Sequence, residues 1–123
     1  MKTPSEILHN LARFSGTEQF TRFSPLFPKL LATDGIIYLA QECQSYWMLD
    51  IIGSVQQMPK IKAEGFLTVI YNKKAGKVVI SDGNGNMLYE QTVSSPTFPL
   101  NEIKLFVCDG EGGTRIVLLP SEY

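Results

Sequence analysis

The sequence predicts an α+β fold in which two N-terminal helices pack on one face of a C-terminal five-stranded antiparallel meander sheet. Apolar residues recur at helical spacing over residues 1–58, whereas short β-branched and aromatic runs alternate with turn clusters over residues 65–120. Helices followed by a run of strands are typical of this layered arrangement. No linker separates the two halves, and 123 residues is a usual domain size, so we expect one domain over residues 1–123.

The first helix is predicted to begin after Thr3. The segment Thr3-Pro4-Ser5-Glu6 combines an N-cap hydroxyl, a proline at the first helical position and the glutamate of a capping box. Ser15-Gly16 is expected to end this helix. Its apolar stripe consists of Ile7, Leu8, Leu11 and Phe14.

Residues 16–33 are apolar but contain Pro25 and Pro28, which favours an irregular connector. A second, longer helix is predicted to begin at Thr33-Asp34-Gly35, where a side-chain oxygen can accept from a free backbone N–H. It should run as far as Pro59, because proline cannot continue a helix.

The second half of the chain is predicted to form five consecutive antiparallel strands. Clusters of Gly, Asn and Asp between the apolar runs supply the residues that tight reversals require. The expected strands are Phe66–Tyr71, Lys77–Ser81, Met87–Val93, Ile103–Cys108 and Arg115–Leu119.

The charge distribution argues against a nucleic-acid-binding protein, since the formal net charge is only −1. Residues 60–77 nevertheless carry a net charge of +4, with five lysines against Glu64. Lysines on a hairpin protect sheet edges from aggregation, and the alternative is a patch that binds phosphate groups. These lysines are Lys60, Lys62, Lys73, Lys74 and Lys77.

The chain has no apolar run of the roughly 20 residues that cross a bilayer, and its first residues lack the apolar segment of a signal peptide. We therefore expect a cytoplasmic protein without membrane association. Cys43 and Cys108 each lie in an apolar segment without a neighbouring cysteine, as free thiols of a reducing compartment do, and a disulfide between them is the alternative.

Residues suited to catalysis or to metal binding are few. His9 is the only histidine and falls on the polar side of the first helix, so no Ser-His-Asp or Cys-His arrangement is expected, nor a zinc site. Residues 82–86 begin like a calcium loop, but Met87 and Val93 stand where an EF-hand needs glycine and glutamate, which favours a hairpin turn. We expect no catalytic residues, no cofactor and no metal.

One face of the second predicted helix carries an unusual set of polar residues. Glu42, Tyr46 and Asp50 are spaced four residues apart and should form one ridge. Asp50 is surrounded in sequence by apolar residues, so a buried carboxylate there must be hydrogen-bonded or paired. Two interpretations stay open: Asp50 pairs with backbone N–H groups or with Arg22, or it forms a ligand site with Tyr46. Trp47 is either a core anchor or a stacking surface for a ligand.

Several segments resemble a family of small bacterial proteins known as a domain of unknown function, and this resemblance covers nearly the whole chain. The most specific segment is Tyr46-Trp47-Met48-Leu49-Asp50. Members often carry an Arg-His pair where this chain has Arg22-Phe23. The resemblance implies a single domain and brings no mechanism. The other segments are Gly16-Thr17-Glu18, Thr33-Asp34-Gly35, Asp82-Gly83-Asn84-Gly85-Asn86 and Leu119-Pro120-Ser121-Glu122-Tyr123.

The sequence favours a non-catalytic interaction module, whose sheet edge or exposed sheet face binds a protein partner or a second copy of the chain. The alternative is a small polar-ligand binder or enzyme at the junction of helix and sheet. The candidate site residues for either function are Glu18, Arg22, Asp34, Glu42, Tyr46, Trp47 and Asp50.

Overall fold

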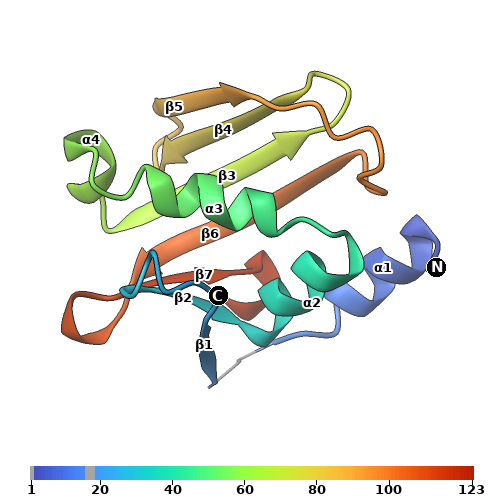
Figure 1. The fold of residues 1–123 in the computed structure, drawn as a ribbon, viewed down its shortest axis with the longest axis horizontal. Coiled ribbons are helices and arrows are strands. Elements are labelled where there is room, and N and C mark those ends of the chain that lie inside the picture. Colours follow the sequence, from blue (N-terminus) through green and yellow to red (C-terminus); the bar gives the residue numbers. More distant parts are fainter. Residues whose placement is uncertain (1, 16–18) are drawn as a thin grey trace.

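The computed structural model describes residues 2–15 and 19–123, and it has the expected α+β class (Figure 1). Helices α2 and α3 lie across one face of a twisted sheet (Figure 1). The helices are α1 (Pro4–Leu11), α2 (Asp34–Glu42), α3 (Tyr46–Ser54) and α4 (Pro59–Lys62), and the short 3₁₀ turns are η1 (Glu111–Gly113) and η2 (Pro120–Glu122). The strands are β1 (Phe20–Arg22), β2 (Leu30–Thr33), β3 (Phe66–Asn72), β4 (Lys77–Asp82), β5 (Met87–Thr92), β6 (Glu102–Asp109) and β7 (Arg115–Leu118).

The sheet is mixed and has the strand order β1-β2-β7-β6-β3-β4-β5, so the predicted five-stranded meander is wrong. After β5 the chain crosses back, and β6 pairs with β3 rather than with β5. The crossing segment is anchored by Phe98 and Leu100, which are 0% and 2% exposed. Burial of these two apolar side chains stabilises the crossover, and a sequence pattern of strands and turns does not reveal it.

The predicted irregular connector contains two strands. Leu30–Thr33 forms β2, which pairs in parallel with β7 along Leu30–Arg115 and Leu31–Ile116. Pro25 and Pro28 lie outside both strands, so they do not interrupt the pairing. The expectation of an all-antiparallel sheet is therefore wrong at this one pair.

The predicted long helix is also wrong, because it is two helices separated by a tight turn. Residue Gln44 has φ 51°, a left-handed conformation that ends α2. The turn is closed by a bond of 2.9 Å from the Ser45 backbone N–H to the carbonyl of Ala40, and by the Ser45 hydroxyl, which donates to Leu39 at 3.4 Å. This break turns α3 away from the axis of α2 (Figure 1).

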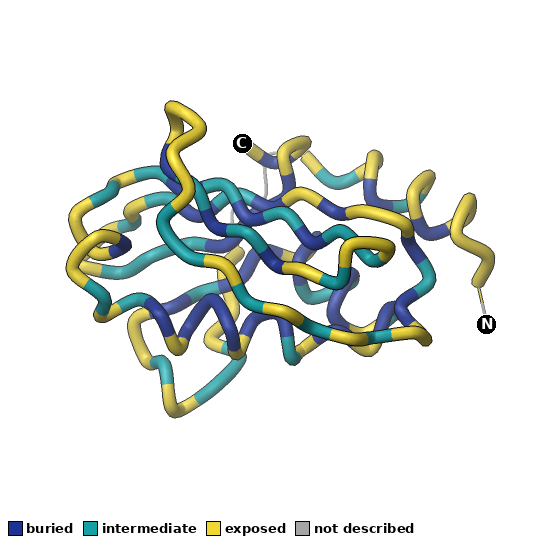
Figure 2. Tube along the Cα trace, turned by 90° about the horizontal axis from the view of Figure 1, so that it is seen from above, coloured by how far each residue is buried: buried dark blue, intermediate teal, exposed yellow. Residues whose placement is uncertain are grey.

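The core lies between the sheet and the helices. Buried and half-buried residues alternate along β3, so every second side chain points toward the helices. Figure 2 shows that buried residues gather in the middle of the molecule and exposed ones at its loops. At its centre the ring of Trp47 meets the buried ring of Tyr71 edge-on at 5.1 Å, and Tyr71 meets Phe98 at 5.2 Å. The capping box predicted for the first helix is present, with Thr3 and Glu6 bonding each other's backbone N–H.

Both cysteines are free thiols, as expected from their spacing. Cys43 is buried, and burial raises the pKa of its thiol to about 11. Cys108 is half-buried on β6, where burial likewise raises its pKa.

Candidate functional site

The described residues of the predicted site are spread over β1, both ends of α2, and α3. Glu18 lies outside the described residues. Arg22 on β1 and Asp34 at the start of α2 are both exposed. Glu42 forms an ion pair with Lys2 at 3.0 Å. The predicted ridge is interrupted, because Glu42 ends α2 while Tyr46 begins α3.

The two interpretations of Asp50 both depend on where its side chain lies. Asp50 and Tyr46 are both exposed on α3, and within residues 2–15 and 19–123 Asp50 forms no ion pair with Arg22 or any other cation. Successive side chains of a helix point in different directions, so apolar neighbours in the sequence do not bury the residue between them. Trp47 packs against Tyr71 and Phe98, and also borders a shallow pocket with Ile51 and Gln91.

A different site is formed where β6 ends, β7 begins and the segment from α3 to α4 passes. It is a pocket of about 600 Å³. Part of its lining is apolar, and the rest carries amide, hydroxyl and charged side chains. The lining residues include Leu26, Phe27, Leu30, Gln57, Lys29, Lys62, Asp109 and Arg115.

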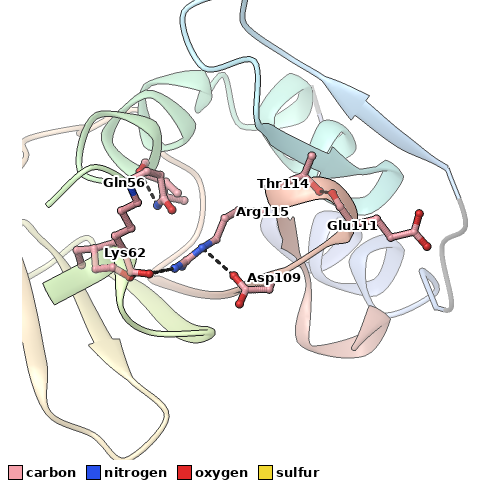
Figure 3. Close-up of polar contacts among 8 residues, drawn as sticks. Gln56, Lys62, Asp109, Glu111, Thr114 and Arg115 are labelled. Carbon is pink, nitrogen blue, oxygen red and sulfur yellow. Dashed lines mark hydrogen bonds and ion pairs between the residues drawn. The ribbon is translucent and has the colours of Figure 1, made fainter. Parts of the chain in front are cut away.

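Arg115 is the most constrained side chain of this pocket. Its Nε forms an ion pair with Asp109 at 3.1 Å, and its Nη2 donates to the carbonyl oxygens of Ile61 at 3.1 Å and Lys62 at 3.0 Å (Figure 3). The side chain is 12% exposed, compared with 65% for Asp109. Arg115 thereby joins the last carbonyls of α4 to the sheet, as cations do at helix C-termini.

The remaining guanidinium nitrogen of Arg115, Nη1, is buried and has no hydrogen-bond partner in the described part of the chain. A buried donor without a partner costs roughly 1 to 3 kcal/mol, and more when it belongs to a charged group. Such groups are rare in folded proteins, so each requires an explanation, such as a bound ligand, a water molecule or local strain. Here the unpartnered nitrogen belongs to a residue of the pocket wall.

Two lysines add positive charge at the same pocket. Lys29 donates from Nζ to the carbonyl oxygen of Gly112 at 3.3 Å, and Lys62 is exposed at the end of α4. Neither lysine has an acidic partner among the residues that the structure describes. With Asp109 as the one acidic side chain in the lining, the wall is positively charged overall.

The apolar wall depends on a close approach of Phe27 to α3. A Cβ atom at Gly53 would lie 2.4 Å from the Phe27 ring, so only glycine leaves room for this ring. Gln56 is held on the same helix turn by a bond of 2.8 Å from its side-chain amide to the carbonyl of Ile52. The Phe27 ring, which belongs to the turn between β1 and β2, is therefore packed directly against α3.

The sequence patterns did not find this pocket, because its residues come from four separate segments. One signal was present: a hairpin between the last two predicted strands pairs Asp109 with Arg115, as the register shows. The parallel neighbour β2, which contributes Leu30, was not predicted. Of the lysines in residues 60–77, only Lys62 lines this pocket, whereas Lys73 and Lys74 lie in the β3–β4 turn.

The remaining candidates have structural roles. Asp82 accepts backbone N–H bonds from Asn84 and Asn86 at 2.8 and 2.9 Å, which is the chemistry of a hairpin turn. Over residues 2–15 and 19–123, no group of three His, Cys, Asp or Glu side chains is arranged to hold a metal ion. In the same ranges no helix has the length and hydropathy to cross a membrane.

Comparison with known proteins gives a fold and a family. A crystal structure of a protein of unknown function from Enterococcus faecalis is similar, with a TM-score of 0.54 and 19% identity, covering 85% of this chain and 98% of that chain. Comparison with curated proteins found no significant match. Residues 5–123 match DUF6876, a family of unknown function, which confirms the resemblance expected from the sequence. This α+β protein with a basic pocket beside β7 thus belongs to the DUF6876 family.

Proposed function

We propose that this protein binds a small organic anion in the pocket beside Arg115, without catalysing its conversion. The observation that carries the proposal is the cationic lining of a pocket of about 600 Å³, in which Arg115, Lys29 and Lys62 are accompanied by one acidic side chain, Asp109. A carboxylate or phosphate group accepts charge-assisted hydrogen bonds from such cationic side chains.

The charges around the pocket favour an anion. Lys29 and Lys62 line the same pocket as Arg115 and have no acidic partner among the described residues, whereas Asp109 already pairs with Arg115. Attraction between these cations and an anion is stronger in a partly desolvated pocket than in open water. Arg115 is itself fixed by three contacts, so little side-chain entropy is lost when an anion binds.

The apolar part of the lining favours a ligand with an apolar body. Phe27 is half-buried and Leu26 is exposed, so both offer carbon surface to a ligand. Pockets of roughly 300 to 1,000 Å³ with apolar walls and a few convergent polar groups are usual for small molecules. The proposed ligand class is therefore a carboxylate or phosphate attached to an aromatic or short aliphatic group.

A binding role is favoured over catalysis by the kinds of side chain present. The pocket is lined by lysine, arginine, amide and hydroxyl groups, and the only histidine of the chain, His9, is exposed on α1 and does not line it. General acid and base catalysis near neutral pH most often uses histidine.

A second candidate is the interaction module that the sequence favours. It is supported by a different surface, the sheet face opposite α3, on which half-buried side chains, including the apolar Phe66, Ile70 and Val79, alternate with the buried core residues.

The binding proposal is tested by calorimetric titration with 2-naphthoate, which carries a carboxylate on a flat apolar body, and with 2-naphthol, the neutral counterpart. We expect saturable binding of 2-naphthoate that weakens with added salt, and much weaker binding of 2-naphthol. Titration with inorganic phosphate measures the anion contribution alone.

Lys62→Gln is the informative variant, because Lys62 is exposed and its loss should leave the fold intact. Loss of one charge-assisted contact should weaken 2-naphthoate binding roughly tenfold. Lys60→Gln is the matched control, since Lys60 is exposed on the same helix but does not line the pocket. Equal affinities of both variants, or equal binding of 2-naphthol and 2-naphthoate, would contradict the proposal.

A further inference from the structure

The second face of the sheet carries apolar side chains interspersed with small polar ones on its central strands. The side chains of β3 that alternate with the core residues are half-buried, and the pairing of β3 with β4 and β6 fixes their neighbours. One transverse row across β6, β3, β4 and β5 reads Lys104, Ile70, Val79 and Glu90. A second row, one step along the strands, reads Phe106, Thr68, Ser81 and Met87.

Two exposed apolar side chains belong to this face. Met87 is 59% exposed at the start of the edge strand β5. Tyr123 is 74% exposed and meets the rings of Phe66 and Phe106 edge-on at 5.2 and 5.6 Å. Large apolar side chains gathered on one face mark an interaction surface more often than singly scattered ones do.

The first row has opposite charges at its two ends, with Lys104 on β6 and Glu90 on β5. Ile70 and Val79 occupy the two positions between them. Consider a second copy placed face to face with the first and related to it by a 180° rotation about an axis that is parallel to the strands and lies between β3 and β4. The order of the row is then reversed in the second copy. Lys104 then faces the Glu90 position of the second copy, and Ile70 faces its Val79 position.

The second row is complementary under the same rotation. Phe106 then faces the exposed Met87 position of the other copy, and Thr68 faces its Ser81 position. Sulfur and aromatic ring form a favourable contact. Two sheets pack face to face about 10 Å apart, a distance that residues of these sizes fill.

We propose that this sheet face is the interface of a homodimer with two-fold symmetry, in which Lys104 of each copy pairs with Glu90 of the other. The interface is isologous, so each copy contributes the same patch. Glu90 also accepts from Lys77 of its own chain at 2.6 Å, and Lys104 lies 5.4 Å from the centre of the Phe106 ring. Both charges are therefore held on this face before the copies meet.

Charge reversal provides a decisive test of this arrangement. In a dimer of the Lys104→Glu variant, two acidic residues face each other at each end of the row. In a dimer of the Glu90→Lys variant, two basic residues face each other there. Each variant by itself should therefore dissociate at concentrations at which the wild type is dimeric. A mixture of the two variants restores both opposite-charge pairs, and should form a heterodimer. Lys74→Glu, at an exposed lysine of the β3–β4 turn, is the matched control and should remain dimeric.

The measurement is sedimentation velocity across a dilution series, with circular dichroism to verify that each variant is folded. The expected result is a shift toward monomer of at least tenfold in dissociation constant for each single variant, and its recovery on mixing. A monomeric wild type at every concentration overturns the proposal, as does a mixture that dissociates like its components. Dimers that persist in both variants overturn it as well, since another surface must then hold them.

These outcomes are independent of the anion-binding proposal. The residues of the two rows do not line the pocket beside Arg115. Titration with 2-naphthoate can therefore detect binding, or fail to detect it, whether or not the protein forms the proposed dimer.

Discussion

Glu122 accepts a hydrogen bond of 2.6 Å from the hydroxyl of Thr33, across a separation of 89 residues. The same carboxylate accepts from the backbone N–H of Gly35 at 3.2 Å and of Leu119 at 3.0 Å. Thr33 is the N-cap of α2, so Glu122 lies where the free N–H groups and the positive end of the helix dipole favour an anion. This buried cluster joins the turn after β7 to the start of α2.

Replacing Glu122 should destabilise the whole fold. Glu122→Ala leaves the buried hydroxyl of Thr33 and two backbone donors without their acceptor, and we expect a loss of about 2 to 4 kcal/mol. Glu122→Gln keeps one acceptor oxygen and should lose less. Urea unfolding measures both. Ser121→Ala, which removes only a bond of 3.5 Å to Leu11, is the control and should stay within about 0.5 kcal/mol of the wild type.

Tyr71→Phe should leave stability unchanged or raise it. The Tyr71 hydroxyl is buried without a hydrogen-bond partner in the described part of the chain, and burying such a group is unfavourable. The ring contacts with Trp47 and Phe98 remain in the variant. Thermal unfolding provides the measurement. A loss above about 1 kcal/mol would mean that the hydroxyl is satisfied, for example by a water molecule.

Asp82 should contribute to the acid sensitivity of the fold. The side-chain amide of Asn86, followed by backbone N–H groups, lowers the pKa of this carboxyl below its ordinary value of 3.8. A lowered pKa means that the contribution is present above pH 3.8 and is lost as the pH falls through the folded-state pKa.

The variant Asp82→Asn isolates this contribution. Its stability difference from the wild type should be largest near neutral pH and shrink below pH 3.8, measured as urea midpoints across the acid range. A difference that stays constant with pH would show that the charge of Asp82 is not what stabilises the turn.

Cys43 should be nearly inert in the folded protein. Burial, with a smaller contribution from Glu42, raises its thiol pKa to about 11, and alkylation requires the thiolate. Iodoacetamide near pH 8, read by mass spectrometry, should label Cys43 slowly until denaturant is added. The variant Cys108→Ser removes the other thiol, and rapid labelling of this folded variant would contradict the expectation.

The local structure of this chain was predictable where short-range chemistry determines it. The capping box of Thr3 and Glu6 and the five C-terminal strands lie where the sequence placed them, within one residue at each strand end. Tight turns were predictable for the same reason, since Gly76 and Gly85 have the positive φ that these reversals require.

Long-range structure was not predictable from the same patterns. The left-handed Gln44 is a conformation that its residue type does not suggest, and it divides the expected helix. Pairing of β2 with β7 depends on burial between segments more than eighty residues apart. The pocket depends on that pairing, because Arg115 at the start of β7 lies beside β2. Since the pairing was not predictable, the sequence indicated other residues for the site.

The parallel pairing of β2 with β7 has a consequence during synthesis. Strand β2 leaves the ribosome more than eighty residues before its partner is complete at residue 118, and the acceptor of Thr33 follows at residue 122. Until then β2 presents an apolar edge without a partner, a state in which strands associate with other chains. Productive folding should therefore be a late event, and nascent chains of this protein should depend on chaperone protection more than their small size suggests.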